Sequence, residues 1–202
     1  MTLELLTAIV AFAFVSSITP GPNNLMLLAS GVNYGFKRSI PHMLGIAVGF
    51  VVMMAMVGIS LMQIFDAYPL THTLLKVFSI VYLLFLSYKI ATASAPSRTA
   101  SKEGKPLTFI QAALFQWVNP KAWTMAMMAI SMYSPSRSVQ SVLILSCIFG
   151  LVNLPSISFW TVLGQQLRTF LSDPVKLRAF NYTMAILLVA TLYPVLAPGM
   201  GS

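Results

Sequence analysis

Long stretches without ionisable side chains are the feature that most constrains how this 202-residue chain folds. Asp, Glu, Lys and Arg are absent from 5–36, 39–65, 138–167 and 179–202, and 106–136 contains only Lys121. A helix crosses a bilayer with about 20 mostly apolar residues. Apolar residues make up 57% of the chain and charged residues 8%, against about 25% charged in soluble domains. The sequence therefore predicts an integral membrane protein.

Six candidate membrane helices follow when the interval 67–88, with its single Lys76, is added to these windows. We expect them near 4–30, 40–62, 70–91, 108–131, 139–164 and 177–197. The predicted fold is all-α, one transmembrane domain over 1–202. A first three-helix repeat covers about 1–92, a polar cytoplasmic linker about 93–106, and a second repeat about 107–202.

The basic residues fall in alternate connections between these segments. Nine of the twelve lie after the first, third and fifth segments, namely Lys37, Arg38, Lys89, Arg98, Lys102, Lys105, Arg168, Lys176 and Arg178. Loops rich in Lys and Arg stay in the cytoplasm. We therefore expect both termini outside, and we ascribe the net charge of +8 to this topology and to contact with the lipid bilayer rather than to nucleic acid.

Metal, redox and enzymatic chemistry lack the residues they need. The chain has one cysteine, two histidines and four scattered acids, too few for a metal cluster, a disulfide or a thiol pair. No paired carboxylates, metal motif or serine with a base lies within a predicted membrane segment. We expect no cofactor and no catalytic residue.

Two proline motifs lie about half a chain apart. Ile18-Thr19-Pro20-Gly21 and Val118-Asn119-Pro120-Lys121 are offset by 100 residues. With three segments in each half, the two copies would run in opposite directions, as in an inverted repeat. Proline removes a helical hydrogen bond and crowds the preceding turn, so we expect the first and fourth helices to break here. The run Pro22-Asn23-Asn24 would then restart the first helix, with the asparagines as caps.

Lys121 lies near the middle of the fourth segment, where a lysine costs about 2.5–3.5 kcal/mol. One interpretation is a structural cation that holds the carbonyls of the broken first helix. The other, which we favour, is a cavity role: binding a substrate carboxylate, carrying a proton, or both. No acid lies at the centre of a predicted segment to neutralise it.

Other polar residues in apolar segments have alternative interpretations. Asn153 and Pro155 mark a polar break in the fifth segment that is either a packing kink or a cavity wall, and Gln116 could face the same cavity. His42 is predicted to lie at the membrane interface. Gly45 and Gly49 have the spacing of small residues in a close helix contact.

At these residues the chain resembles the LysE/RhtB family of amino-acid exporters. The similarity rests on Thr19 to Asn24, Gly35-Phe36, Gly45 to Phe50 and Gln116 to Lys121, and it extends over the whole chain. Within the family, the Pro-Asn-Asn version resembles the cysteine/O-acetylserine efflux branch. The resemblance implies a proton-driven exporter of small neutral amino acids (homoserine/threonine, cysteine/O-acetylserine or leucine class) in the bacterial inner membrane. A membrane-embedded scaffold, or a carrier for another small anionic solute, is the alternative.

The sequence thus predicts one substrate site at the two breaks and leaves a homo-oligomer open. Its residues are Thr19, Pro20, Gly21, Pro22, Asn23, Asn24, Gln116, Asn119, Pro120, Lys121, Asn153 and Pro155.

Overall fold

The computed structural model describes residues 2–61, 70–93, 104–134 and 138–196, and all regular structure in these ranges is helical. In chain order the elements are α1 (Leu3–Ile18), α2 (Pro22–Tyr34), α3 (Phe36–Met56), the π-helical turn η1 (Val57–Leu61), α5 (Leu70–Ala91), α6 (Phe109–Phe115), the 3-10 turn η2 (Gln116–Val118), α7 (Pro120–Tyr133), α8 (Val139–Phe170), α9 (Pro174–Ala190) and α10 (Tyr193–Leu196).

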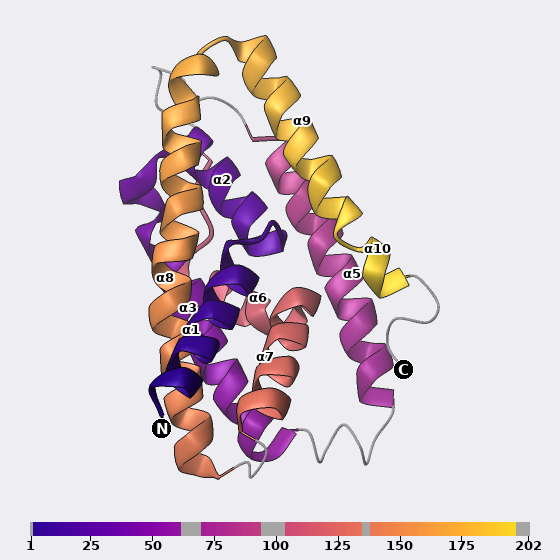
Figure 1. Ribbon diagram of the computed structural model, residues 1–202. Coiled ribbons are helices and arrows are strands. Elements are labelled where there is room, and N and C mark those ends of the chain that lie inside the picture. Colours follow the sequence, from indigo (N-terminus) through magenta and orange to yellow (C-terminus); the bar gives the residue numbers. More distant parts are fainter. Residues whose placement is uncertain (1, 62–69, 94–103, 135–137, 197–202) are drawn as a thin grey trace.

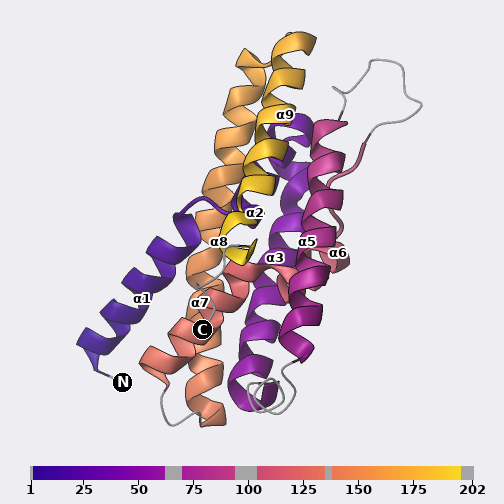
Figure 2. The same ribbon diagram turned by 90° about the vertical axis from the view of Figure 1, so that its right-hand side faces the viewer.

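The helices form an elongated bundle around α8, which runs almost its full height (Figure 1). α1 and α2 follow one another along α8, and α5 pairs with α9 on the other side. Figure 2 shows α1 leaning away from the rest of the bundle toward the N-terminus. The chain starts new helices at side-chain caps: Thr2, Ser138 and Asp173 each accept a hydrogen bond from a first-turn amide, and Thr108 forms a capping box with Gln111.

Two of the described helices are long and apolar enough to cross a membrane on their own. They cover Phe36–Ile59 and Val139–Phe170, and the pair α1 and α2, bent by 57°, counts as a third if it is one span. α5 matches the predicted third segment in its bounds, and α6 with α7 covers the predicted fourth. The helical segments are thus where the sequence places them, whereas six crossings and an inverted repeat stay predictions. Most of the predicted linker lies outside the described residues.

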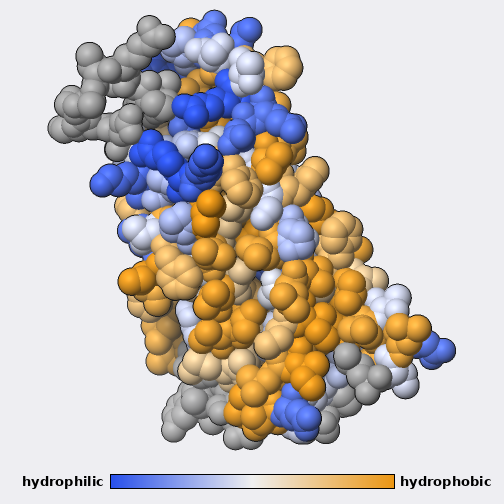
Figure 3. All heavy atoms as spheres, turned by 90° about the vertical axis from the view of Figure 1, so that its left-hand side faces the viewer, coloured by the Kyte–Doolittle hydropathy of each residue, from blue (hydrophilic) through white to orange (hydrophobic). Residues whose placement is uncertain are grey.

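The connections predicted to be cytoplasmic meet at one end of the bundle. Arg38 donates a hydrogen bond to the Gly104 carbonyl at 3.5 Å, and the Gln165 side chain accepts one from the Phe36 amide. Asn181 within α9 donates to the Ala93 carbonyl after α5 at 2.9 Å. Figure 3 shows a hydrophilic end above a broad apolar face. Clustering of basic loops at one end fits the alternation read from the sequence.

Glycines bring helix backbones into direct contact at two places. A methyl group at Gly45 or Gly49 would collide with the α6 backbone at Phe109 or Ala113, so the predicted packing role of both glycines is confirmed. Gly31 and Gly164 face each other where α2 crosses α8, and a methyl group at either would strike the other helix's backbone. Glycine is required at these crossings because no side chain fits between the helices.

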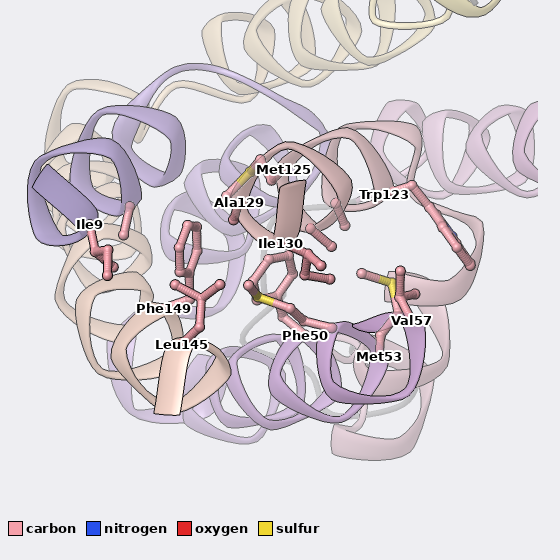
Figure 4. Packing of buried hydrophobic residues seen from close by; sticks show 14 residues of the cluster. Ile9, Phe50, Met53, Val57, Trp123, Met125, Ala129, Ile130, Leu145 and Phe149 are labelled. Atoms are coloured by element: carbon pink, nitrogen blue, oxygen red, sulfur yellow. The ribbon is translucent and has the colours of Figure 1, made fainter. Parts of the chain in front are cut away.

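One apolar cluster fills the space between α1, α3, α7 and α8 (Figure 4). Phe50 and Phe149 are fully buried, with ring centroids 6.0 Å apart. Close packing of such side chains gives each helix many dispersion contacts. The cluster therefore anchors α7 and α1 to α3 and α8 directly below the two helix breaks.

Candidate substrate site at the two helix breaks

The first break separates α1 from α2, and side chains satisfy the carbonyls that it frees. Asn24 donates to the Ser17 and Thr19 carbonyls at 2.8 and 2.7 Å, and the Trp160 indole N–H donates to the Ile18 carbonyl at 3.0 Å. Carbonyls at a helix end must find partners when water is excluded. The predicted break is confirmed, and α8 supports it through Trp160.

Asn23 and Asn24 do not cap α2, so that part of the prediction is wrong. The N-cap position is Gly21, which makes no side-chain capping bond, and Pro22 is the first helical residue. Proline fits there because it has no N–H to leave unpaired. Asn24 instead points its amide back to the end of α1.

Lys121 reaches from α7 to the end of α1. Its ammonium donates to the Thr19 carbonyl at 2.6 Å, to the Thr19 hydroxyl at 2.9 Å and to the Pro20 carbonyl at 3.4 Å. A cation is favoured at a helix C-terminus by the helix dipole. Gly21 leaves room for this side chain, because a methyl group there would overlap the Lys121 stem. In this conformation Lys121 occupies the structural position that the sequence offered as the alternative.

The second break lies between α6 and α7 and has a similar local form. The 3-10 turn η2 ends at Asn119, which caps α7 by accepting from the Lys121 amide, and Pro120 is the first helical residue. The Trp123 indole donates to the Trp117 carbonyl at 2.9 Å. Pro22 and Pro120 thus hold the same position, the first residue of a restarted helix, and Pro20 does not, although only α7 has a side-chain cap.

A reciprocal pair of amide hydrogen bonds joins the two breaks. Asn23 donates to Gln116 at 2.8 Å, and Gln116 donates back to Asn23 at 3.2 Å. Gln116 is fully buried and also donates to the Ala112 carbonyl. Gln116 therefore binds the first half of the chain to the second, instead of facing the open cavity.

A small cavity lies between the breaks. Polar lining comes from Ser16, Ser17, Gly21, Asn23, Asn24, Asn119, Lys121 and Asn153, and apolar lining from Phe50, Ala122, Met125 and Ile157. Its open volume is about 20 Å³, which is room for about one water molecule. Phe50 and Met125, which line its apolar side, belong to the apolar cluster drawn in Figure 4. The cavity is thus too small for an amino acid, and we call this conformation the closed form.

Two buried oxygen atoms in this cavity wall have no hydrogen-bond partner. They are the Ser17 hydroxyl and the Asn153 side-chain carbonyl, on residues 5% and 4% exposed. Buried polar atoms are nearly always paired, so such exceptions need a reason. Within the described part of the chain Lys121 forms no ion pair, and no group of three or more metal-binding side chains occurs. A ligand with both donors and a negative group would satisfy all of these atoms.

Most of the predicted residues lie at this junction, and Pro155 does not. α8 continues unbroken through Pro155, which is exposed on its outer side, so the predicted fifth-segment break is wrong although Asn153 lines the cavity. His42 is 2% exposed, buried among helices near the end where the basic connections meet, and its predicted interfacial depth stays a prediction. The sequence analysis missed Ser17 and Trp160. The hydroxyl pair Ser16-Ser17, just before the proline motif in a stretch without ionisable side chains, was the available signal.

Fold and site together define a polytopic membrane carrier built around broken helices. Residues 14–191 match the family model described as LysE type translocator, and the chain belongs to this family. It is a transporter, not an enzyme. The chain is similar to the cysteine/O-acetylserine efflux proteins of Escherichia coli strains K12 and HS and of Shigella sonnei strain Ss046. Identity is 28% over 193 residues, which cover 94% of this chain and 96% of each relative. No solved structure matches at a significant level.

Proposed function

We propose that this protein exports small neutral amino acids or close derivatives, of the cysteine/O-acetylserine class, across the bacterial inner membrane in exchange for protons. Membership of the translocator family and the names of the efflux relatives support export of such a substrate. The observation that carries the site assignment is the pair of unpartnered oxygens, on Ser17 and Asn153, around the cavity where the breaks meet.

Lys121 binds the substrate carboxylate in this proposal by exchanging partners. Its ammonium has three N–H donors, and in the closed form they are directed to Thr19 and Pro20. A carboxylate is a stronger acceptor for an ammonium than a neutral carbonyl. Binding would therefore release Lys121 from the α1 end, while the substrate ammonium donates to the Ser17 and Asn153 oxygens.

Substrate entry requires the cavity to enlarge, since about 20 Å³ does not hold an amino acid. The Lys121 bonds to Thr19 connect α7 to α1 directly across the cavity. In this proposal, substrate binding releases these bonds and so allows the two halves to separate. A ligand can drive a conformational change only if its contacts differ between the two states, and the exchange of Lys121 partners supplies that difference.

Transport by purified protein in liposomes tests the function. Vesicles loaded with labelled O-acetyl-L-serine should release it when a proton gradient is imposed, and a gradient-collapsing ionophore should slow release. Lys121→Met should abolish export, Lys121→Arg should be partly active because a planar fork replaces a compact ammonium, and the exposed Lys76→Met is the control.

A competition experiment distinguishes a structural role of Lys121 from a role in binding the substrate carboxylate. The amide of O-acetylserine lacks the carboxylate and should compete far less well than the acid in the parent protein. Equal competition by the amide, or normal export by a folded Lys121→Met variant, would reject the binding role. Absence of export by the parent for every small neutral amino acid would reject the function itself.

The proposed topology places both termini outside. Alkaline-phosphatase fusions should be active after residues near 67, 135 and 200 and inactive near 37, 100 and 172, because the enzyme is active only outside the cytoplasm. The three silent fusions lie in the basic connections that follow the first, third and fifth segments. An active fusion near 100 or a silent one near 200 would overturn the six-span arrangement.

A further inference from the structure

A second cavity lies at the end of the bundle where the basic connections meet. It is enclosed by α2, α3, α5 and the chain leading into α6, and its open volume is about 60 Å³. Its polar lining comprises Ser30, Asn33, Tyr34, His42, Lys89 and Lys105. That volume is room for a few water molecules or for a small ligand group. Nothing assigned above uses this cavity.

His42 is the unsatisfied group in its wall. The side chain is 2% exposed, and neither ring nitrogen has a hydrogen-bond partner among the described residues. The neighbouring polar side chains already have hydrogen-bond partners, since Ser30 bonds to Ser39 at 2.7 Å and Asn33 donates to Asn181 at 2.9 Å. A neutral imidazole offers one N–H donor and one acceptor. His42 therefore lines the cavity with a donor and an acceptor that no described residue satisfies.

The charges around this cavity favour an anionic ligand. Lys89 and Lys105 line it from two different segments. Among the described residues the acids are Glu4, in the first turn of α1, and Asp173, which caps α9, and neither lines the cavity. Two ammonium groups, with no carboxylate among the described lining residues, create a positive potential that a partly enclosed cleft concentrates.

We propose that this cavity is an entry site that binds the carboxylate of a cytoplasmic amino acid, with Lys89 and Lys105 on the carboxylate and His42 completing its hydrogen bonds. The proposal rests on the export function above and adds a second, earlier binding step. His42 and Lys121 belong to different cavities, with different lining residues. The substrate would thus be selected for its negative group before it reaches the helix breaks.

Histidine NMR reports on this site separately from transport. His42 and His72 are the only histidines, so His72→Gln leaves the two ring nitrogens of His42 as the only source of ¹⁵N-imidazole signal. In phosphatidylcholine nanodiscs, O-acetyl-L-serine should shift that signal saturably. Its methyl ester should reach half-saturation at a concentration at least about tenfold higher, as expected when a charge-assisted hydrogen bond is lost. Lys89→Met and Lys105→Met should each raise half-saturation about tenfold. Lys76→Met, also on α5, is the matched control and should behave as the parent.

Three results would overturn the proposal. The first is a His42 signal that responds equally to the ester and to the acid. The second is a shift of the His42 signal caused by phosphatidylglycerol in the nanodisc without solute, which would assign the site to a lipid headgroup. The third is loss of the His42 response in Lys121→Met, which would place the binding event at the helix breaks. A parent protein that fails to export while His42 still responds to the acid would count against the export function alone.

Discussion

Replacement of Asn24 by leucine tests how the first helix break is stabilised. Asn24 is 3% exposed and donates two hydrogen bonds, to the Ser17 and Thr19 carbonyls. Thr19 keeps Lys121 as a partner, whereas Ser17 loses the side-chain donor that satisfies it. Side-chain hydrogen bonds within membrane proteins contribute about 0.6 kcal/mol on average and up to about 1.7. Two lost bonds therefore predict a loss of about 1–3 kcal/mol in the free energy of unfolding.

Steric-trap unfolding in bicelles measures that free energy directly. Trp160→Phe is a milder companion variant: it keeps an aromatic ring but removes the single bond to the Ile18 carbonyl, so it should lose about 0.6–1.7 kcal/mol. Thr183→Val, which removes an exposed hydroxyl on α9, is the control and should change the value by less than about 0.5 kcal/mol. Parent-like stability of both Asn24→Leu and Trp160→Phe would show that side chains do not hold this break.

Two further perturbations probe the contacts between helices. Gly164→Ala should lower the free energy of unfolding by about 1–3 kcal/mol or prevent folding, because its methyl group meets the Leu28 backbone. Gly150→Ala meets only a side chain of α3 and should cost clearly less in the same assay. Equal losses would refute the crossing geometry. Replacing the side chains of Asn23 and Gln116 singly and together, in a double-mutant cycle on the free energy of unfolding, should give a coupling energy of about 0.5–2 kcal/mol. Additive losses of stability would show that the pair does not act as a unit.

The positions of the helix breaks were predictable because proline acts locally. Pro22 and Pro120 each lack the amide that would continue a preceding helix and crowd its last turn, and both begin a new helix in the structure. Pro155 obeys the same rule less strictly, since α8 passes through it without ending. A single proline can be absorbed in a long helix that its neighbours hold, whereas Pro20-Gly21-Pro22 offers no helical alternative.

The partners at the breaks were not predictable because they come from distant segments. Lys121 meets Thr19 across 102 residues, and Trp160 meets Ile18 across 142. Sequence analysis identified Lys121 from its cost in an apolar segment, but only packing shows which acceptor it reaches. The burial of His42 was not predictable for a related reason: nearness to a segment end says nothing about the helices that cover the side chain.

The contact of Gly31 with Gly164 has a consequence for how motion in this protein is measured. Where the two backbones touch, no side chain lies between them that could change rotamer, so we expect α2 and α8 to move as one rigid unit. Spin labels placed on these two helices should keep a constant separation through the transport cycle. The distance from a spin label on α7 to one on α2 or α8 would then report substrate-driven opening.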